Sequence, residues 1–465
     1  MISIIDNLEK WAINQPDIVA YKNDSAELTY RQLYDFTRLY GELLKKQGKG
    51  PVMIIGHKDV DFFVSIFSCI YANRTYIPID ISLPKKRIEK ISEISNSKLI
   101  ITKYSGYKFD NTETLNLNQL LVYSKFDNLE NDNNIAYYIF TSGSTGNPKG
   151  VQITYLNLNN FIEWIGRLNG EKHLNVLNQA LFSFDLSVAD LFFSVCYGHT
   201  LIALEKTNVF DYGYISNVVM SNNINYIVAT PTFLKLCLLD FDFSKKNFPS
   251  IELVYLCGET LDSSTAKKIL KRFPDVKLMN AYGPTEATSA VSMIQITPDI
   301  IKNNTVLPVG DEKSFATEIE IVNGEIVLKG KSVFFGYLKD NDCKHYKESV
   351  KDCFKTGDLG NIINGYLYCF GRKDRQVKYI GYRIELGEIE RAILEIDSVD
   401  NCFVKQVNDE SGNVKYLFAT VVSGKVNSKQ MLVKELRKSL PEYMIPKHFE
   451  FKEDITYNEN YKAKG

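Results

Sequence analysis

Apolar and polar residues alternate along positions 27–110 in blocks that predict helices and strands in turn. Short, continuous apolar runs fit buried strands, and longer stretches repeat large apolar side chains at a helical period. Thr29 precedes one of the helical stretches and is a plausible N-cap. The alternation predicts a mainly parallel, doubly wound sheet in an α/β fold. The expected strands are 52–56, 76–80 and 99–102, and the expected helices begin near 28, 59 and 83.

A second feature of the pattern is a buried strand, 135–140, that breaks into a loop rich in glycine and hydroxyl groups. An amphipathic pattern resumes beyond Val151, so the loop is expected to join a strand to a helix. Glycines let backbone N–H groups turn toward one point, an arrangement suited to phosphate oxygens, although such loops are also common surface turns. It is not a Walker loop, because Lys149 is followed by Gly150. The loop contains Thr141, Ser142, Gly143, Ser144, Thr145, Gly146 and Lys149.

Three later apolar runs also end in small or polar residues. They are 226–233, 253–260 and 278–288. Ligands of open α/β sheets collect at the carboxyl ends of the strands, so these ends are expected to meet at a binding site. Tyr282 offers an aromatic face there, and Glu286 a carboxylate suited to a Mg²⁺ shared with phosphates.

Asp185 lies among apolar residues, where an isolated carboxylate is costly unless it is paired or hydrogen-bonded. Two interpretations are open from the residues alone. The carboxylate either caps the following helix or pairs with a buried cation.

Composition narrows the class of protein. The 465 residues allow two or three domains, and a net charge of −1 gives no support for a nucleic-acid partner or a membrane surface. Eight scattered cysteines without a CxxC pattern fit reduced thiols of a cytoplasmic protein. The N-terminus does not read as a signal peptide, and no apolar run reaches ~18 residues, so no membrane insertion is expected.

The order of four motifs is far more specific than any one of them. The loop 141–150 is followed by Tyr-Gly-Pro-Thr-Glu at 282–286, Thr-Gly-Asp at 356–358 and a Gly-Arg to Glu-Ile-Glu block at 371–390. This order resembles the adenylate-forming superfamily, which includes amino-acid adenylation domains of nonribosomal peptide synthetases, acyl-CoA ligases and luciferases. The resemblance runs from Leu28 to the C-terminus. Several segments look closest to the D-alanine:D-alanyl-carrier-protein ligases, namely 182–188, 256–259, 284–288 and 440–446.

The resemblance implies that a carboxylate attacks the α-phosphate of ATP, giving an acyl-adenylate and pyrophosphate, with ATP and Mg²⁺ as cofactors. Tyr282 would lie against adenine, and Asp358 with Arg372 would hold the ribose. Thr285, Glu286 (with Mg²⁺) and Lys462 would be catalytic. The ATP-binding residues implied are the loop residues Thr141, Ser142, Gly143, Ser144, Thr145, Gly146 and Lys149, together with Asn280, Ala281, Tyr282, Gly283, Asp358 and Arg372.

The resemblance also implies that Asp185 pairs with the α-ammonium of the substrate, which favours a small amino acid, D-alanine first. Ala189 replaces a larger methionine of the D-alanine ligases, which opens room that Tyr255 partly refills. Cys257 fits a pocket wall better than a reactive thiol, because no partner lowers its pKa. The implied amino-acid-binding residues are Asp185, Leu186, Ala189, Val228, Tyr255, Cys257, Ala281, Ser289 and Ala290.

Two domains are implied, an adenylation core at 1–373 and a mobile α+β lid at 374–465 with its hinge at Asp374. The core would contain doubly wound sheets and a small β subdomain. The acyl group would pass to the phosphopantetheine thiol of a carrier protein.

Lys462 fills the position of the superfamily's catalytic lysine, with Lys464 as a competing assignment. Lys462→Ala is expected to lower adenylation by ~10²-fold or more. Alternative functions are a peptide-pathway adenylation enzyme for another amino acid, an acyl-CoA ligase, or a catalytically impaired nucleotide-binding homologue.

Overall fold

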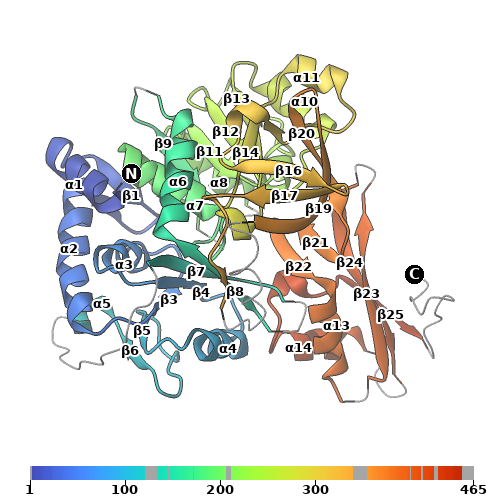
Figure 1. Ribbon diagram of the computed structural model, residues 1–465, viewed down its shortest axis with the longest axis horizontal. Coiled ribbons are helices and arrows are strands. Elements are labelled where there is room, and N and C mark those ends of the chain that lie inside the picture. Colours follow the sequence, from blue (N-terminus) through green and yellow to red (C-terminus); the bar gives the residue numbers. More distant parts are fainter. Residues whose placement is uncertain are drawn as a thin grey trace.

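The computed structural model describes most of the chain and places two large sheets in an N-terminal domain beside a smaller, β-rich C-terminal domain (Figure 1). This mixed α/β architecture confirms the predicted fold class. The described residues are 3–120, 134–143, 147–170, 172–205, 211–338, 353–397, 399–409, 412–423 and 428–452.

The first large sheet has eight strands in the order β14-β13-β12-β11-β9-β10-β1-β2. The strands from β13 to β1 are parallel, and β14 and β2 pair antiparallel at the two edges. The strands are β1 (Val19–Lys22), β2 (Glu27–Thr29), β9 (Asn175–Asn178), β10 (Thr200–Ala203), β11 (Tyr226–Ala229), β12 (Leu253–Leu256), β13 (Lys277–Tyr282) and β14 (Ser292–Gln295).

The second large sheet has the order β18-β8-β7-β4-β3-β5-β6, and its strands from β7 to β6 are parallel. The three expected strands at 52–56, 76–80 and 99–102 all belong to it. The strands are β3 (Val52–Gly56), β4 (Tyr76–Asp80), β5 (Leu99–Ile101), β6 (Glu113–Leu115), β7 (Ile135–Thr141), β8 (Lys149–Thr154) and β18 (Gly336–Tyr337).

The glycine-rich loop does not lead directly into a helix, so that prediction was wrong. It connects β7 to β8, which pairs antiparallel with β7, and helix α6 (Tyr155–Ile165) begins only after β8. Val151 and Ile153 are buried while Gln152 and Thr154 are half-buried, which is the two-residue period of a strand.

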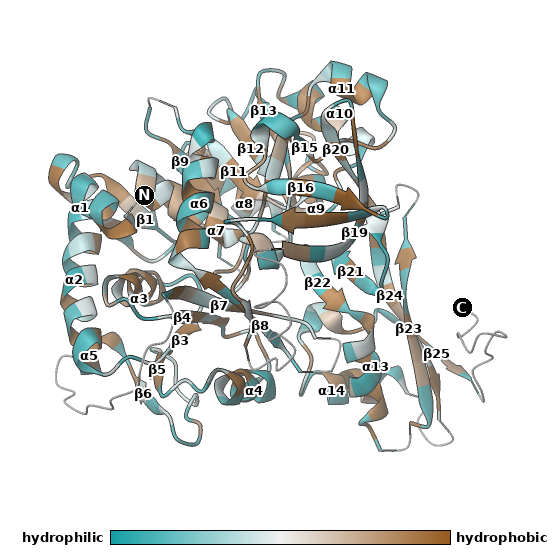
Figure 2. Ribbon diagram, in the orientation of Figure 1, coloured by the Kyte–Doolittle hydropathy of each residue, from teal (hydrophilic) through white to brown (hydrophobic). Residues whose placement is uncertain are grey.

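Helices cover both faces of the sheets, and the apolar residues concentrate in the strands and on the inner helix faces (Figure 2). Thr29 caps α2 in a capping box with Gln32, as predicted. The other described helices are α1 (Ile4–Asn14), α2 (Tyr30–Lys46), α3 (Val60–Tyr71), α4 (Lys85–Ser95), α5 (Leu117–Leu120), α7 (Ser187–Tyr197), α8 (Tyr212–Ser221), α9 (Pro231–Cys237), α10 (Ser263–Arg272), α11 (Pro298–Asn303), α13 (Leu386–Leu394) and α14 (Lys429–Leu436).

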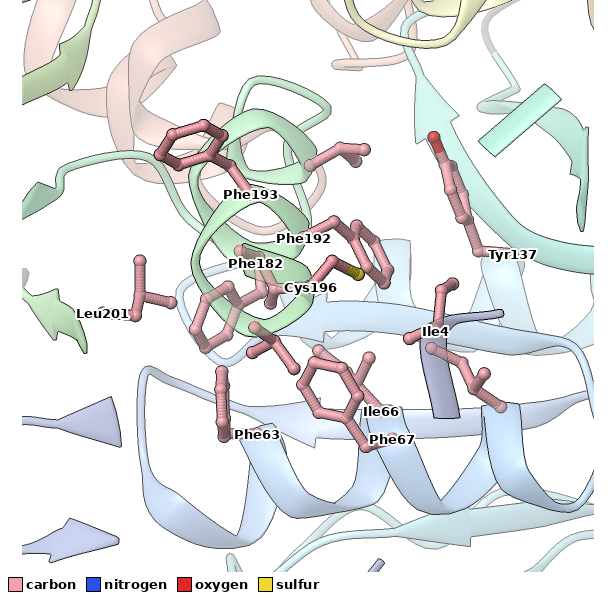
Figure 3. Packing of buried hydrophobic residues seen from close by; sticks show 14 of the residues in the cluster. Ile4, Phe63, Ile66, Phe67, Tyr137, Phe182, Phe192, Phe193, Cys196 and Leu201 are labelled. Atoms are coloured by element: carbon pink, nitrogen blue, oxygen red, sulfur yellow. The ribbon is translucent and has the colours of Figure 1, made fainter. Parts of the chain in front are cut away.

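The core between the two large sheets is rich in aromatic rings around α7 and α3 (Figure 3). Phe192 of α7 meets Phe67 of α3 edge to face at 6.2 Å, and the ring of Phe182 lies 5.5 Å from that of Phe62. Buried Phe182 therefore anchors the segment that carries Asp185.

The remaining strands form an antiparallel sheet attached to the N-terminal domain and the sheets of the C-terminal domain, which has its own apolar cluster. The domain boundary at 373/374, the hinge at Asp374 and the mobility of the C-terminal domain stay predictions. The strands are β15 (Gly310–Asp311), β16 (Glu318–Val322), β17 (Glu325–Lys329), β19 (Cys353–Ile363), β20 (Tyr366–Arg372), β21 (Gln376–Tyr379), β22 (Tyr382–Glu385), β23 (Asn401–Asn408), β24 (Val414–Val422) and β25 (His448–Lys452).

Candidate active site

Three polar strand ends meet at one edge of the eight-stranded sheet, as expected. β11, β12 and β13 are parallel neighbours, with Ala229 in register with Leu256 and Leu256 in register with Asn280. The loops that follow these strands therefore leave the sheet side by side.

The predicted ribose-binding residues lie in one hydrogen-bonded network. The Tyr282 hydroxyl donates to Asp358 Oδ2 at 2.7 Å, and Arg372 Nη1 donates to Asp358 Oδ1 at 2.6 Å. Arg372 also binds Asp374 through Nε and Nη2, each at 2.7 Å. The predicted hinge acid thus shares its arginine with the predicted ribose acid. Gly357 is required beside them, because its backbone is left-handed (φ 77°) and a Cβ there would lie 2.6 Å from Arg372 Nη2.

A pocket of about 400 Å³ opens beside this network and is lined by residues of both domains, including Asn280, Tyr282, Asp358 and Lys378. Asn280 is buried and fixed by a 2.8 Å hydrogen bond from its side-chain nitrogen to the Pro308 carbonyl. The pocket has the location and the polar lining that the predicted nucleotide site needs.

The described part of the predicted phosphate loop binds the C-terminal domain. Ser142 Oγ donates to the Arg383 carbonyl at 2.8 Å and accepts from the Glu385 N–H at 3.1 Å. The Gly143 N–H donates to Glu388 Oε2 at 3.1 Å, and the other oxygen of Glu388 pairs with Arg87. A backbone N–H of the loop therefore holds an anionic oxygen, which is the chemistry expected for phosphate.

Of the other residues predicted for the phosphate loop, the structure describes only Thr141 and Lys149. Ser144, Thr145 and Gly146 lie outside the described residues, as does Lys462. The Lys149 ammonium lies 5.5 Å from the centre of the Tyr337 ring. Thr141 ends β7, directly before Ser142.

Glu286 is a buried, charged carboxylate in a short 3₁₀ helix at Thr285–Ala287. It accepts a 2.5 Å hydrogen bond from the Tyr337 hydroxyl and forms a 2.5 Å ion pair with Arg383 of β22. Burial acts to raise the pKa of Glu286, but the charge of Arg383 and the Tyr337 hydrogen bond outweigh it, so the pKa is lowered. Sequence reasoning assigned no role to Arg383, although it lies in a motif quoted above, and no pattern pointed to Tyr337.

Glu286 fits a magnesium ligand of the kind that shares the ion with phosphates. Among the described residues, no group of three or more His, Cys, Asp or Glu side chains could hold a metal on its own. Mg²⁺ in nucleotide sites takes one or two carboxylates and completes its shell with phosphate oxygens and water. A single ionised Glu286 matches that need.

Asp185 is buried directly before α7 and does not cap it. The helix starts at Ser187 with Leu186 as N-cap, and no side chain bonds to the cap, so the capping interpretation was wrong. Burial raises the pKa of Asp185 to about 6 against the lowering effect of a hydrogen bond from Thr285, and the charge of Glu286 raises it further. Asp185 forms no ion pair with any described residue, in contrast to Glu286.

The other predicted amino-acid-binding residues are buried around Asp185. Leu186, Ala189, Val228, Tyr255, Cys257, Ala281 and Ala290 share one apolar cluster, and Ser289 is buried beside them. Cys257 Sγ lies 4.0 Å from the Ser289 carbonyl, and burial raises the pKa of Cys257 to about 12, as expected for an unreactive wall residue. Gly283 lies so close to this loop that a Cβ would be 2.4 Å from the Ala290 Cα.

Comparison with known families now decides the class of this protein. The model of the "AMP-binding enzyme" family matches residues 8–338, and that of the "AMP-binding enzyme C-terminal domain" matches residues 388–462. The chain belongs to the AMP-binding enzyme family. The match covers both the core and the C-terminal region that resemblance indicated.

Similar proteins include ligases named for a carrier protein. The chain is 35% identical to the D-alanine–D-alanyl carrier protein ligase of Bacillus cytotoxicus, over 99% of this chain and 98% of that protein. Its identity to the ligase of the same name from Listeria monocytogenes is also 35%, over 99% and 97%.

Two solved structures show the same fold. The adenylation domain AlmE of Vibrio cholerae, in complex with glycyl-adenosine-5'-phosphate, matches with a TM-score of 0.83 and 22% identity over 98% of this chain and 94% of that chain. The o-succinylbenzoate CoA synthetase of Bacillus subtilis matches with a TM-score of 0.84 and 20% identity over 98% and 97%. Within the described residues, no helix is both long and apolar enough for a membrane span.

Proposed function

We propose that this AMP-binding enzyme activates a small amino acid with ATP and transfers it to a carrier protein. The substrate carboxylate attacks the α-phosphorus of ATP, the bond to the β-phosphate breaks, and pyrophosphate leaves. The phosphopantetheine thiol of the carrier then attacks the acyl carbon of the aminoacyl-AMP, loses its proton and releases AMP.

The observation that carries this proposal is the buried carboxylate of Asp185 without an ion-pair partner among the described residues. A buried carboxylate favours a cationic partner, and the α-ammonium of an amino acid supplies one. Thr285 links it to Glu286, so the ammonium would sit next to the phosphate end of the site.

The remaining roles follow the residues described above. Asp358 and Arg372 would hold the ribose, Tyr282 would lie against adenine, and Glu286 would bind Mg²⁺, which draws charge from the phosphates when bound. Lys462 would complete the charge stabilisation. D-alanine, after which the similar ligases are named, is the reference substrate.

The C-terminal region from Asp374 onward would act as a mobile lid. Its contacts to Ser142, Gly143 and Glu286 support this role, because they join the C-terminal region directly to the predicted phosphate site. A cytoplasmic location is part of the proposal and is supported by the seven described cysteines, all free thiols.

ATP–pyrophosphate exchange over small D- and L-amino acids tests the first step. We expect exchange that depends on the amino acid and on Mg²⁺, followed by thioester formation when a phosphopantetheinylated carrier protein is added. Absence of amino-acid-dependent exchange with every amino acid tested would overturn the proposal.

A further inference from the structure

Two residues predicted to bind the amino acid have buried hydroxyl groups without a hydrogen-bond partner among the described residues. Tyr255 of β12 is fully buried, and its hydroxyl has no hydrogen-bond partner in the described structure. The hydroxyl of Ser289 is likewise buried and unpartnered. Buried polar groups are normally hydrogen-bonded, so two such groups among the residues predicted to bind the amino acid call for an explanation.

Tyr255 lies on the face of the sheet that is covered by α7, the helix that begins two residues after Asp185. It lies in register with Val228 on β11, and Val228 with Asn178 on β9, so all three side chains share the sheet face on which α7 packs. Burial raises the pKa of Tyr255 well above its usual range, and the charges of Cys257, Tyr226 and Asp185 add to this.

Ser289 lies beside Cys257, close to the end of the strand that carries Tyr255. Its carbonyl lies 4.0 Å from the Sγ of Cys257, which follows β12 two residues after Tyr255. Ser289 and the preceding Thr288 both have left-handed backbones, with φ of 70° and 62°. That conformation is uncommon outside glycine, so the loop places Ser289 beside Cys257 at some cost in conformational free energy.

Three other residues predicted to bind the amino acid have small, apolar side chains. Ala189, Ala281 and Ala290 are all buried and offer no hydrogen bond from their side chains. Among the residues predicted to bind the amino acid, Tyr255 and Ser289 are therefore the two whose hydroxyl groups are buried and without a partner in the described part of the chain.

We infer that the preferred substrate is a small amino acid with a side-chain hydroxyl, of the serine class, recognised by Tyr255 and Ser289. The inference rests on the proposed function and moves the preference away from alanine. One hydroxyl both donates and accepts, so it can bond to both groups, whereas a methyl group leaves both unpaired. Sites that hydrogen-bond a substrate hydroxyl reject the analogue without it far more strongly than apolar pockets reject one methylene.

Pyrophosphate exchange with purified full-length enzyme tests this inference. The measured quantity is kcat/KM for serine divided by kcat/KM for alanine, in the D and the L series separately, with glycine and threonine alongside. We expect serine to exceed alanine of the same configuration by about 10-fold or more in the series that the enzyme accepts. Alanine or glycine at parity with serine or above it would overturn the inference.

Two variants assign the effect to the hydroxyls. Tyr255→Phe is expected to lower the serine-to-alanine ratio by about 10-fold, mainly through KM for serine, and Ser289→Ala by about 3-fold or more. Unchanged ratios in both variants would remove these residues from recognition. If one variant fails to fold, judged by its thermal transition, the other and the wild-type ratio decide.

Tyr226→Phe is the matched control. Tyr226 lies on the same sheet face in β11 and also has a buried, unpartnered hydroxyl, but the carboxylate that acts on it is Asp190. Removal of the Tyr226 hydroxyl should leave the serine-to-alanine ratio unchanged, and an equal loss in this variant would mean that the hydroxyls act only through the fold.

Exchange with alanine alone overturns this inference and leaves the proposed function standing, whereas exchange with no amino acid overturns both.

Discussion

The proposed amino-acid end and the proposed phosphate end of the site each contain a buried carboxylate, and the two carboxylates differ in their partners. Glu286 at the phosphate end is paired with Arg383 and hydrogen-bonded by Tyr337, and its pKa is lowered. Asp185 at the amino-acid end has no ion pair among the described residues, and burial raises its pKa to about 6. Arg383 forms an ion pair with Glu286, whereas Lys378 and Arg383 act on Asp185 without an ion pair among the described residues, and in the proposed function the substrate supplies that partner.

Because their partners differ, the two carboxylates should respond differently to a bound cation. Mg²⁺ at Glu286 would compete with Arg383, which belongs to β22 of the C-terminal domain, so metal binding is tied to the position of that domain. An ammonium at Asp185 would displace no protein cation. The ammonium would instead offset the free-energy cost of burying the charged Asp185 carboxylate.

The largest effect is expected from Asp185→Asn, which removes the charge and keeps the shape. Amino-acid-dependent exchange should fall by about 10²–10⁴-fold, because breaking a buried ion pair on one side costs about 3–5 kcal/mol. Initial rates of exchange at saturating ATP measure this. Asp190→Asn is the matched control, since Asp190 is also buried and its pKa is raised by burial, and it should stay within about 3-fold of wild type.

Glu286→Gln tests the phosphate end. Loss of one preorganised charge contact is expected to lower exchange by about 10²-fold and to raise the Mg²⁺ concentration needed for half-maximal rate. A Mg²⁺ titration of exchange measures both. Glu320→Gln, which removes a surface ion pair with Lys329, should change neither quantity, and an unaltered Mg²⁺ requirement in Glu286→Gln would remove Glu286 from the metal site.

The pH profile should distinguish the two ends without a mutation. Asp185 must be ionised to hold an ammonium, so kcat/KM for the amino acid should fall about 10-fold per pH unit below a pH near 6. Glu286, with its lowered pKa, should stay ionised through that range. A flat profile between pH 5 and 7 would contradict the assignment of Asp185.

The smallest expected effect is on stability. The folded state holds the Asp185 proton more tightly than the unfolded state, so the stability present at low pH is lost as pH rises from 3.8 through about 6. At pH 7 the free energy of unfolding of Asp185→Asn should therefore exceed that of wild type by about 2–3 kcal/mol at most, and the variant should unfold at a higher temperature. The gain should vanish toward pH 4, and an equal gain at both pH values would point to another cause.

The sequence predicted the strands and their polar ends well, because apolar runs and turn residues are local signals. The resemblance put Tyr282 and Asp358 in one site, and a hydrogen bond joins these two residues in the structure. The hairpin of β7 and β8 was missed, because a two-residue period in Val151 and Ile153 was hidden by the helical pattern that follows.

The ion-pair partners of the carboxylates could not be predicted from local sequence patterns. Arg383 lies 97 positions from Glu286 along the chain, and Arg87 lies 301 positions from Glu388. Such pairs exist only once the C-terminal domain packs on the core, and no periodicity encodes that packing. The missing partner of Asp185 was inferable only through resemblance, since a buried aspartate before a helix reads equally as a cap.

The most direct test of the central claim compares an amino acid with its deaminated analogue in wild-type enzyme. Exchange is measured with alanine and serine, in the configuration that the enzyme accepts, and with propionate and 3-hydroxypropionate at equal concentrations. The account predicts that loss of the α-ammonium lowers kcat/KM by about 10²-fold or more, and that the same comparison is nearly level in Asp185→Asn. Equal exchange with the acid and the amino acid in wild type would contradict it.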